Sequence, residues 1–152
     1  ALVLTRQNLP TLDRNQLAAA SGLRCGAYVL ADTNGQKPDV ILIGSGSEVA
    51  VCLSARELLA AQGIAARVVS MPSWELFESQ PEEYRQSVLP AEIPARVAVE
   101  AGVGMGWERY IGPSGAFVGM RGFGASAPAN VLMKYFGITA ENVAAVAKEI
   151  IQ

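Results

Sequence analysis

The sequence predicts a three-layer α/β/α sandwich built on a five-stranded mixed sheet. The 152 residues are 51% hydrophobic and 17% charged, which is enough apolar material for one buried core. Short apolar runs alternate with helical segments along the chain, a pattern typical of successive βα units. A tight turn joins the first two apolar runs, so we expect the first strand to be antiparallel in an otherwise parallel sheet.

Five apolar runs are the predicted strands. The first, residues 26–31, leads into the turn Asp32–Gly35, whose Asn-Gly ending is typical of a tight turn. The second, residues 40–43, is apolar without interruption, as expected for a strand that is buried on both faces. The remaining runs are residues 66–70, 96–100 and 116–119.

The first predicted helix covers residues 45–62. Ser45 and Glu48 have the spacing of a capping box, with Ser47 as the competing N-cap, and Gly63 ends the helix. Residues 73–89 predict two short helices around Pro81. Residues 102–110 predict a glycine-interrupted helix or loop. The next helix begins at Pro128 and ends before Gly137. The final helix is capped by Thr139 and has an apolar face formed by Val143, Val146, Ala147 and Ile150.

The N-terminal part has a different composition. Residues 1–5 form a short apolar run, which we expect to be the last strand of an upstream domain. Residues 6–24 are polar and irregular, as in an interdomain linker. We therefore divide the chain into residues 1–24, the end of an upstream domain plus linker, and a domain at 25–152. The opening alanine, in place of methionine, suggests a piece of a longer chain.

Composition excludes several classes of function. The net charge is −2 with no basic stripe, so no nucleic-acid partner is expected. No apolar run approaches the roughly 20 residues of a membrane span, and the N-terminus lacks the layout of a signal peptide, so we expect a cytoplasmic protein. Cys25 and Cys52 are too few and too far apart for a disulfide scaffold or a zinc motif, and Cys52 is expected to pack in the core.

The chain contains no histidine. Histidine is the usual general base near neutral pH and the commonest metal ligand, so neither a Ser–His–Asp nor a Cys–His site can be built here. A metal site would have to use carboxylates alone. We therefore predict no catalytic residue and no metal site, and expect a non-catalytic α/β module.

Two places could still bind a ligand. The turn Ser45-Gly46-Ser47 follows a strand and precedes a helix, so its free N–H groups could hold an anion or a regulatory ligand. The alternative is a helix that caps itself. Glu100 lies at the carboxyl end of a strand, where ligands bind in doubly wound sheets, or it is simply hydrogen-bonded to the following loop. Trp74, Phe77, Trp107 and Tyr110 are expected in the core or at a subunit contact rather than at a ligand.

Eight motifs occur in an order that closely resembles the C-terminal segment of transketolases. The resemblance runs from Leu2 to the last helix. The motifs are TRQNLP (5–10), GAYVL (26–30), GSGSEV (44–49), ARVVSMP (66–72), YRQSVLP (84–90), VAVEAG (97–102), GFGASAP (122–128) and YFGIT (135–139). Each is weak alone, and their order makes the resemblance specific.

The resemblance implies a role within a larger enzyme. Transketolases transfer a two-carbon ketol unit from a ketose phosphate to an aldose phosphate, with thiamine diphosphate and Mg²⁺ held between upstream domains of a homodimer. It implies that this chain is the structural and interface domain, inactive alone, with the upstream domains as its partners. It also implies that Arg6, in the T-R-Q-N motif, contacts the phosphate of the sugar substrate.

Two alternatives stay open at this point. One is a regulatory module that binds a nucleotide or anion near Ser45–Glu48 or Glu100. The other is the last domain of a related thiamine-dependent enzyme, such as deoxyxylulose-phosphate synthase or a 2-oxo acid dehydrogenase β subunit. The T-R-Q-N and F-G-A-S-A-P motifs favour a transketolase over these relatives.

Overall fold

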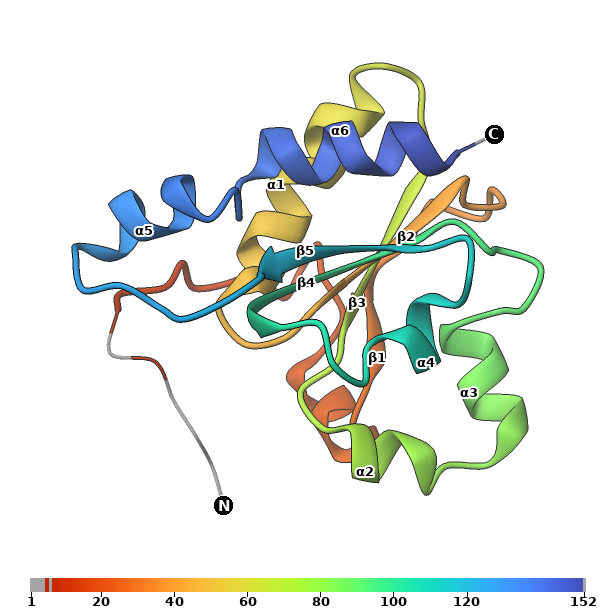
Figure 1. The fold of residues 1–152 in the computed structure, drawn as a ribbon. Helices are drawn as coiled ribbons and strands as arrows, with labels where there is room; N and C mark the ends of the chain where they lie inside the picture. The colour runs from red at the N-terminus through yellow and green to blue at the C-terminus, as the bar shows by residue number, and fades with distance from the viewer. Residues whose placement is uncertain (1–4, 6, 152) are drawn as a thin grey trace.

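Five strands form one sheet in the order β1-β3-β2-β4-β5. The computed structural model describes residues 5 and 7–151 (Figure 1). β1 is antiparallel to β3, and every other neighbouring pair is parallel, so the mixed sheet predicted from the sequence is confirmed. The strands are β1 (Tyr28–Ala31), β2 (Val40–Gly44), β3 (Ala66–Ser70), β4 (Arg96–Val103) and β5 (Ala116–Met120).

Helices cover both faces of the sheet. α1 and α6 pack together on one face, while α2, α3 and α4 lie on the other, and α5 extends to the side (Figure 1). A short 3-10 helix, η1, precedes β1 within the segment expected to be a linker. The bounds are η1 (Ala20–Cys25), α1 (Glu48–Ala60), α2 (Trp74–Glu78), α3 (Glu82–Val88), α4 (Glu108–Ile111), α5 (Ala129–Tyr135) and α6 (Ala140–Ile150).

The apolar run of β2 explains the two cores. Side chains alternate along a strand, so Val40 and Leu42 join the core under α1 and α6, whereas Ile41 and Ile43 join the opposite core. All four side chains are fully buried. Cys52 is fully buried against the first core, which agrees with its predicted packing role.

The four aromatic residues singled out in the sequence belong to the second core. Trp74 and Trp107 meet edge to face with ring centroids 5.2 Å apart, and Tyr110 lies 5.5 Å from Trp74. Trp107, Phe77 and Tyr110 are nearly inaccessible. The interpretation of these side chains as core residues, rather than ligand contacts, therefore agrees with the structure.

The final helix forms as predicted. The Thr139 hydroxyl accepts a hydrogen bond from the Asn142 N–H at 3.3 Å, which caps α6. Val143 and Ala147 are fully buried, and Val146 and Ile150 pack beside them against the first core. The 3.6-residue spacing of these four side chains therefore gives α6 its apolar face.

Three expected boundaries differ from the structure. α1 begins at Glu48, not Ser45, because residues 45–47 form the turn that leaves β2. β4 continues to Val103 through an irregularity in its pairing with β5, so it takes part of the segment that was expected to be a helix or loop. Only the four residues of α4 are helical there. The predicted strand at residues 1–5 lies outside the described residues except for Thr5.

Candidate functional site

The connections of the sheet change direction between β2 and β4. The chain leaves β2 through α1 to reach β3 on one side, and it returns across the opposite face through α2 and α3 to reach β4 on the other side. β2 and β4 are parallel neighbours, with Gly44 opposite Val99, so their carboxyl ends lie together. Such a change of direction is where open α/β sheets bind ligands.

The turn that leaves β2 lies at this change of direction. Gly46 adopts a φ of 55°, a left-handed conformation that favours glycine and reverses the chain before α1. The Glu48 N–H bonds to the Ser45 carbonyl at 3.1 Å. The turn that was predicted as a possible ligand site, Ser45-Gly46-Ser47, thus lies directly after the strand, as expected.

The predicted capping box at Ser45 and Glu48 is wrong. Ser47 holds the N-cap position in helical conformation and makes no capping bond with its side chain. Its hydroxyl donates instead to Glu48 Oε1 at 2.6 Å. Ser45 lies two residues before the N-cap position, on the other side of the left-handed Gly46, so its side chain is not at the start of α1. α1 therefore begins without a side-chain cap.

Glu100 faces the turn from β4. Burial raises the pKa of the Glu100 carboxyl above its ordinary value, and the Glu48 carboxylate raises it further, while the hydrogen bond to Ser45 opposes both effects. Glu48 itself is only 3% exposed. The structure thus brings Ser45 and Glu100 together and adds a second carboxylate that sequence reasoning had placed only in a cap.

This arrangement limits the chemistry at the carboxyl ends of β2 and β4. Two carboxylates beside the turn oppose an anion there, although the N-terminus of α1 by itself would favour one. Within residues 5 and 7–151, no three His, Cys, Asp or Glu side chains are grouped so that they could hold a metal ion. Burial also raises the pKa of the Cys52 thiol, which keeps it protonated. The anion or regulatory site at Ser45, Gly46, Ser47 and Glu100 stays a prediction.

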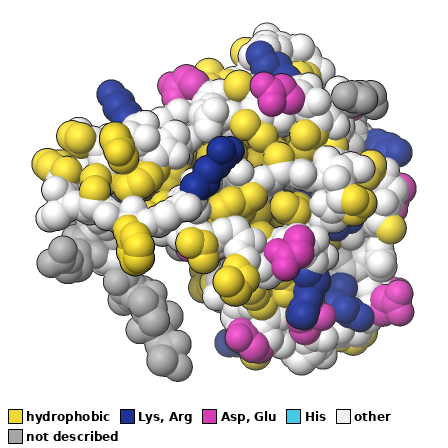
Figure 2. All heavy atoms as spheres, viewed as in Figure 1, with side chains coloured by type: hydrophobic (Ala, Val, Ile, Leu, Met, Phe, Trp, Pro, Cys, Tyr) yellow, Lys and Arg dark blue, Asp and Glu magenta, His cyan; other side chains and the backbone are white. Residues whose placement is uncertain are grey.

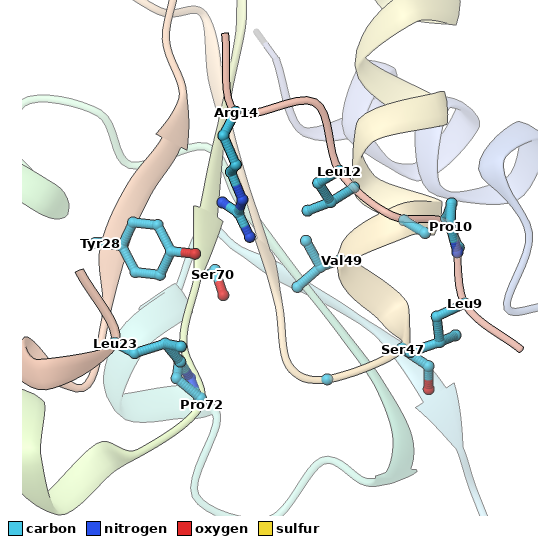
Figure 3. A pocket seen from close by; sticks show the side chains of 12 residues that line it. Leu9, Pro10, Leu12, Arg14, Leu23, Tyr28, Ser47, Val49, Ser70 and Pro72 are labelled. Carbon is cyan, nitrogen blue, oxygen red and sulfur yellow. The ribbon is translucent and has the colours of Figure 1, made fainter. Parts of the chain in front are cut away.

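A hollow lies at the same edge of the sheet, beneath the N-terminal segment (Figure 3). It has a volume of about 220 Å³ and includes Arg14, Tyr28 and Ser70. Sequence reasoning missed it because these residues are far apart in the chain and meet only through the pairing of β1 with β3, which sets Tyr28 opposite Ser70. Arg6, the other predicted site residue, lies outside the described residues.

Comparison with known proteins gives the family. The family model described as transketolase-like TK C-terminal domain matches residues 26–139. The chain belongs to the transketolase family. It is 54% identical over 144 residues to the transketolase of Aquifex aeolicus, which covers 95% of this chain and 21% of that protein. It is 51% identical over 151 residues to transketolase 2 of Escherichia coli, covering 99% of this chain and 22% of that protein.

Solved transketolase structures have the same fold. The transketolase from Leishmania mexicana matches with a TM-score of 0.76 and 47% identity, over 87% of this chain and 19% of that one. A Pichia stipitis transketolase in complex with xylulose 5-phosphate matches with a TM-score of 0.85 and 37% identity, over 96% of this chain and 20% of that one. The chain thus spans about a fifth of the length of these transketolases.

Proposed function

We propose that the chain is the C-terminal structural and interface domain of a transketolase, a cytoplasmic homodimer in its complete form. Residues 1–24 would be the end of the upstream domain and the linker, and residues 25–152 the domain itself. The match to the transketolase C-terminal family over residues 26–139 carries this proposal. The absence of histidine supports a non-catalytic role, because the usual general base is missing from the sequence.

The complete enzyme would transfer a two-carbon ketol unit between sugar phosphates with thiamine diphosphate and Mg²⁺. The described residues do not fit these groups, since they offer no cluster of His, Cys, Asp or Glu side chains for a metal ion. We therefore assign the cofactor and the ion to the other four-fifths of a transketolase, and assign no chemical step to this chain. Arg6 would contribute a guanidinium to the substrate phosphate at the border between domains.

Exposed apolar side chains support the interface role. Five of them, which we call the β5-end patch, are 51% to 101% exposed: Val103, Met105, Phe123, Val131 and Tyr135. They come from the end of β4 and the loop after it, from the loop after β5 and from α5. Figure 2 shows hydrophobic side chains gathered over the α5 side of the molecule. A patch of this kind marks a contact surface.

The occupant we assign to the β5-end patch is the upstream part of the transketolase polypeptide. This chain spans only about a fifth of its relatives, so a large protein surface is available to cover the patch in the complete enzyme. The five named side chains carry no charge, so the covering surface should be apolar as well. A second copy of this chain is the alternative that the experiment below separates.

A chimera tests the proposal. The matched last part of Escherichia coli transketolase 2, which is 51% identical to this chain, would be replaced by the chain. We expect the chimera to transfer ketol units with added thiamine diphosphate and Mg²⁺. An inactive chimera that folds and dimerises would contradict the proposal.

Substitutions in the chimera test the patch. Phe123→Asp is expected to weaken the contact between domains and to lower activity, whereas Leu58→Asp is the control, because Leu58 is 38% exposed on α1 and outside the patch. Equal effects of both substitutions would reject the assigned interface. If the isolated chain dimerises and Phe123→Asp abolishes only that dimer, the second copy is the occupant instead.

A further inference from the structure

The hollow beneath the N-terminal segment has the properties of a ligand pocket. Its walls are apolar and come from the segment itself and from the domain: Leu9, Pro10, Leu12, Leu23, Val49 and Pro72. Its polar groups are Arg14, Tyr28, Ser47 and Ser70. This combination of apolar walls with a few converging polar groups is typical of sites for small molecules.

Two hydroxyl groups in the pocket have no partner among the described residues. Tyr28 is 7% exposed and Ser70 is 8% exposed. They form a directly opposed pair on β1 and β3, so their side chains lie on the same face of the sheet. Neither hydroxyl makes a hydrogen bond within residues 5 and 7–151, and neither oxygen is among the fully buried atoms without a partner. Both oxygens are therefore accessible from the pocket and free to bond to a ligand.

A cation faces the same space. Figure 3 shows Arg14 extending from the N-terminal segment between Tyr28 and Val49, with its guanidinium directed toward Ser70. One of its nitrogens, Nη1, donates to the Ala18 carbonyl at 2.6 Å, and this bond holds the side chain across the pocket. The remaining N–H groups of the guanidinium are left to donate to a ligand.

The position of Tyr28 is fixed by its surroundings. A Cβ atom on Gly22 would lie 2.4 Å from the Tyr28 ring, so the backbone of η1 packs directly on that ring. The hydroxyl therefore stays in place without a ligand. A site whose donors are held in advance loses little freedom on binding.

We propose that this pocket binds a small organic carboxylate, with the carboxylate on Arg14, Tyr28 and Ser70 and an apolar body against the surrounding walls. The planar guanidinium matches a carboxylate in shape and charge. Inorganic phosphate fits less well, because one guanidinium and two hydroxyls must replace the hydration of a dianion beside apolar walls. A cavity of roughly 150 Å³ holds benzene, so a pocket of about 220 Å³ has room for benzoate.

Binding would also fasten the N-terminal segment to the domain. Leu9, Leu12 and Arg14 come from that segment, whereas Val49 and Ser70 come from α1 and β3. A ligand between them contacts both parts at once. This inference stands on the pocket alone and does not depend on ketol transfer.

The test is a titration of the chain with benzoate, in which binding is monitored by the amide NMR signals of Ser47, Ser70 and Tyr28. Benzyl alcohol supplies the same apolar body without charge, and inorganic phosphate supplies charge without the body. We expect saturable shifts with benzoate and no saturable shifts with the other two. Absence of saturation with benzoate, equal binding of benzyl alcohol, or displacement of benzoate by equimolar phosphate would each overturn the proposal.

Variants separate the pocket from the fold. Arg14→Gln and Tyr28→Phe should each weaken benzoate binding by about tenfold or more, because each removes a hydrogen bond to a charged group. Tyr28→Phe keeps the ring that packs on Gly22, so the fold should survive. Arg24→Gln is the matched control, since Arg24 lies in η1 but does not line the pocket. Unchanged affinity in Arg14→Gln, or an equal loss in Arg24→Gln, would contradict the site.

Discussion

Arg67 of β3 holds Asp32 at the end of β1 through two parallel hydrogen bonds. Arg67 Nε donates to Asp32 Oδ1 at 3.0 Å and Nη2 donates to Asp32 Oδ2 at 2.9 Å. The third nitrogen, Nη1, donates to the Ser87 carbonyl in the last turn of α3, at 2.9 Å. One guanidinium therefore joins the antiparallel edge of the sheet to a helix that covers its face.

Replacing Arg67 should destabilise the fold. The Arg67 side chain is only 14% exposed, so Arg67→Met leaves the Ser87 carbonyl without its guanidinium donor and the Asp32 carboxylate with only the Thr33 N–H. We expect a loss of about 2–3 kcal/mol in the free energy of unfolding, measured by urea denaturation. Arg67→Lys keeps the charge but not the two-pronged geometry, so it should recover less than half of the loss. A change below about 0.5 kcal/mol in Arg67→Met would show that the pair is unimportant.

The same pair should make stability sensitive to acid. Burial alone would raise the pKa of Asp32, but hydrogen bonds from Arg67 and Thr33 and the charge of Arg67 hold it below its ordinary value of 3.8. The unfolded chain then binds the proton first, so the stabilisation is complete above pH 3.8 and is lost as the pH falls through the lower folded value. Asp32→Asn should reduce this loss in urea denaturation between neutral and acidic pH. An unchanged pH dependence of stability in Asp32→Asn would contradict this role of Asp32.

Glu100 should act in the opposite direction. Burial and the Glu48 carboxylate raise its pKa above the ordinary value of 4.5, so the folded chain binds this proton more tightly than the unfolded chain. Its ionisation therefore costs stability as the pH rises through the raised value, and below 4.5 the cost is absent. Glu100→Gln should unfold at a higher temperature than the parent chain at pH 8, and the difference should shrink toward pH 4.

Ser45→Ala provides the matched test of that explanation. It removes the hydrogen bond that opposes the rise, so the pKa of Glu100 should move further upward in an NMR titration of its carboxyl group. A fall in this pKa, or a Glu100→Gln variant that is stabilised equally at every pH, would contradict the proposed origin of the shift.

Two glycines with nearly the same φ should respond differently to alanine. Gly26 has a φ of 79° and Gly63 has a φ of 76°, so alanine must adopt an unfavourable positive φ at both. A Cβ at Gly26 would lie 2.3 Å from the Phe77 nitrogen, whereas a Cβ at Gly63 would meet nothing within 4 Å. Gly63→Ala should cost about 1 kcal/mol, and Gly26→Ala about 3 kcal/mol or more because crowding is added. Equal costs in thermal unfolding would refute this reasoning.

Arg6 can be tested in the chimera with Escherichia coli transketolase 2. If its guanidinium holds the phosphate of the substrate, Arg6→Gln should raise KM for a phosphorylated ketose about tenfold or more and leave a ketose without phosphate almost unaffected. Arg24→Gln, which makes the same change of charge within η1, serves as the control. A uniform fall in kcat on both kinds of ketose would point to a structural role.

Local patterns predicted most of the fold. The apolar run of β2 and the four spaced side chains of α6 were recognisable because burial on a strand or helix has a fixed period. The capping box at Ser45 failed because the left-handed turn at Gly46 delays the start of α1 to Glu48, with Ser47 at the N-cap position. The end of β4 was placed too early because glycines at 102 and 104 suggested a break, whereas pairing with β5 carries the strand to Val103.

The candidate sites were less predictable. Sequence reasoning placed Ser45 and Glu100 at ends of strands, and the strand order then brought them together. It did not find Arg14, Tyr28 and Ser70, because no local pattern marks them. Their meeting depends on the path of the N-terminal segment and on the register of β1 against β3.

We propose that this chain supports a transketolase without performing the reaction. The most direct measurement is ketol transfer by the purified chain with thiamine diphosphate, Mg²⁺ and a ketose phosphate and aldose phosphate pair. We expect no turnover above the protein-free rate, while the chimera that carries the chain in place of the matched part of Escherichia coli transketolase 2 is active. Turnover by the purified chain that persists through repeated purification would contradict the claim.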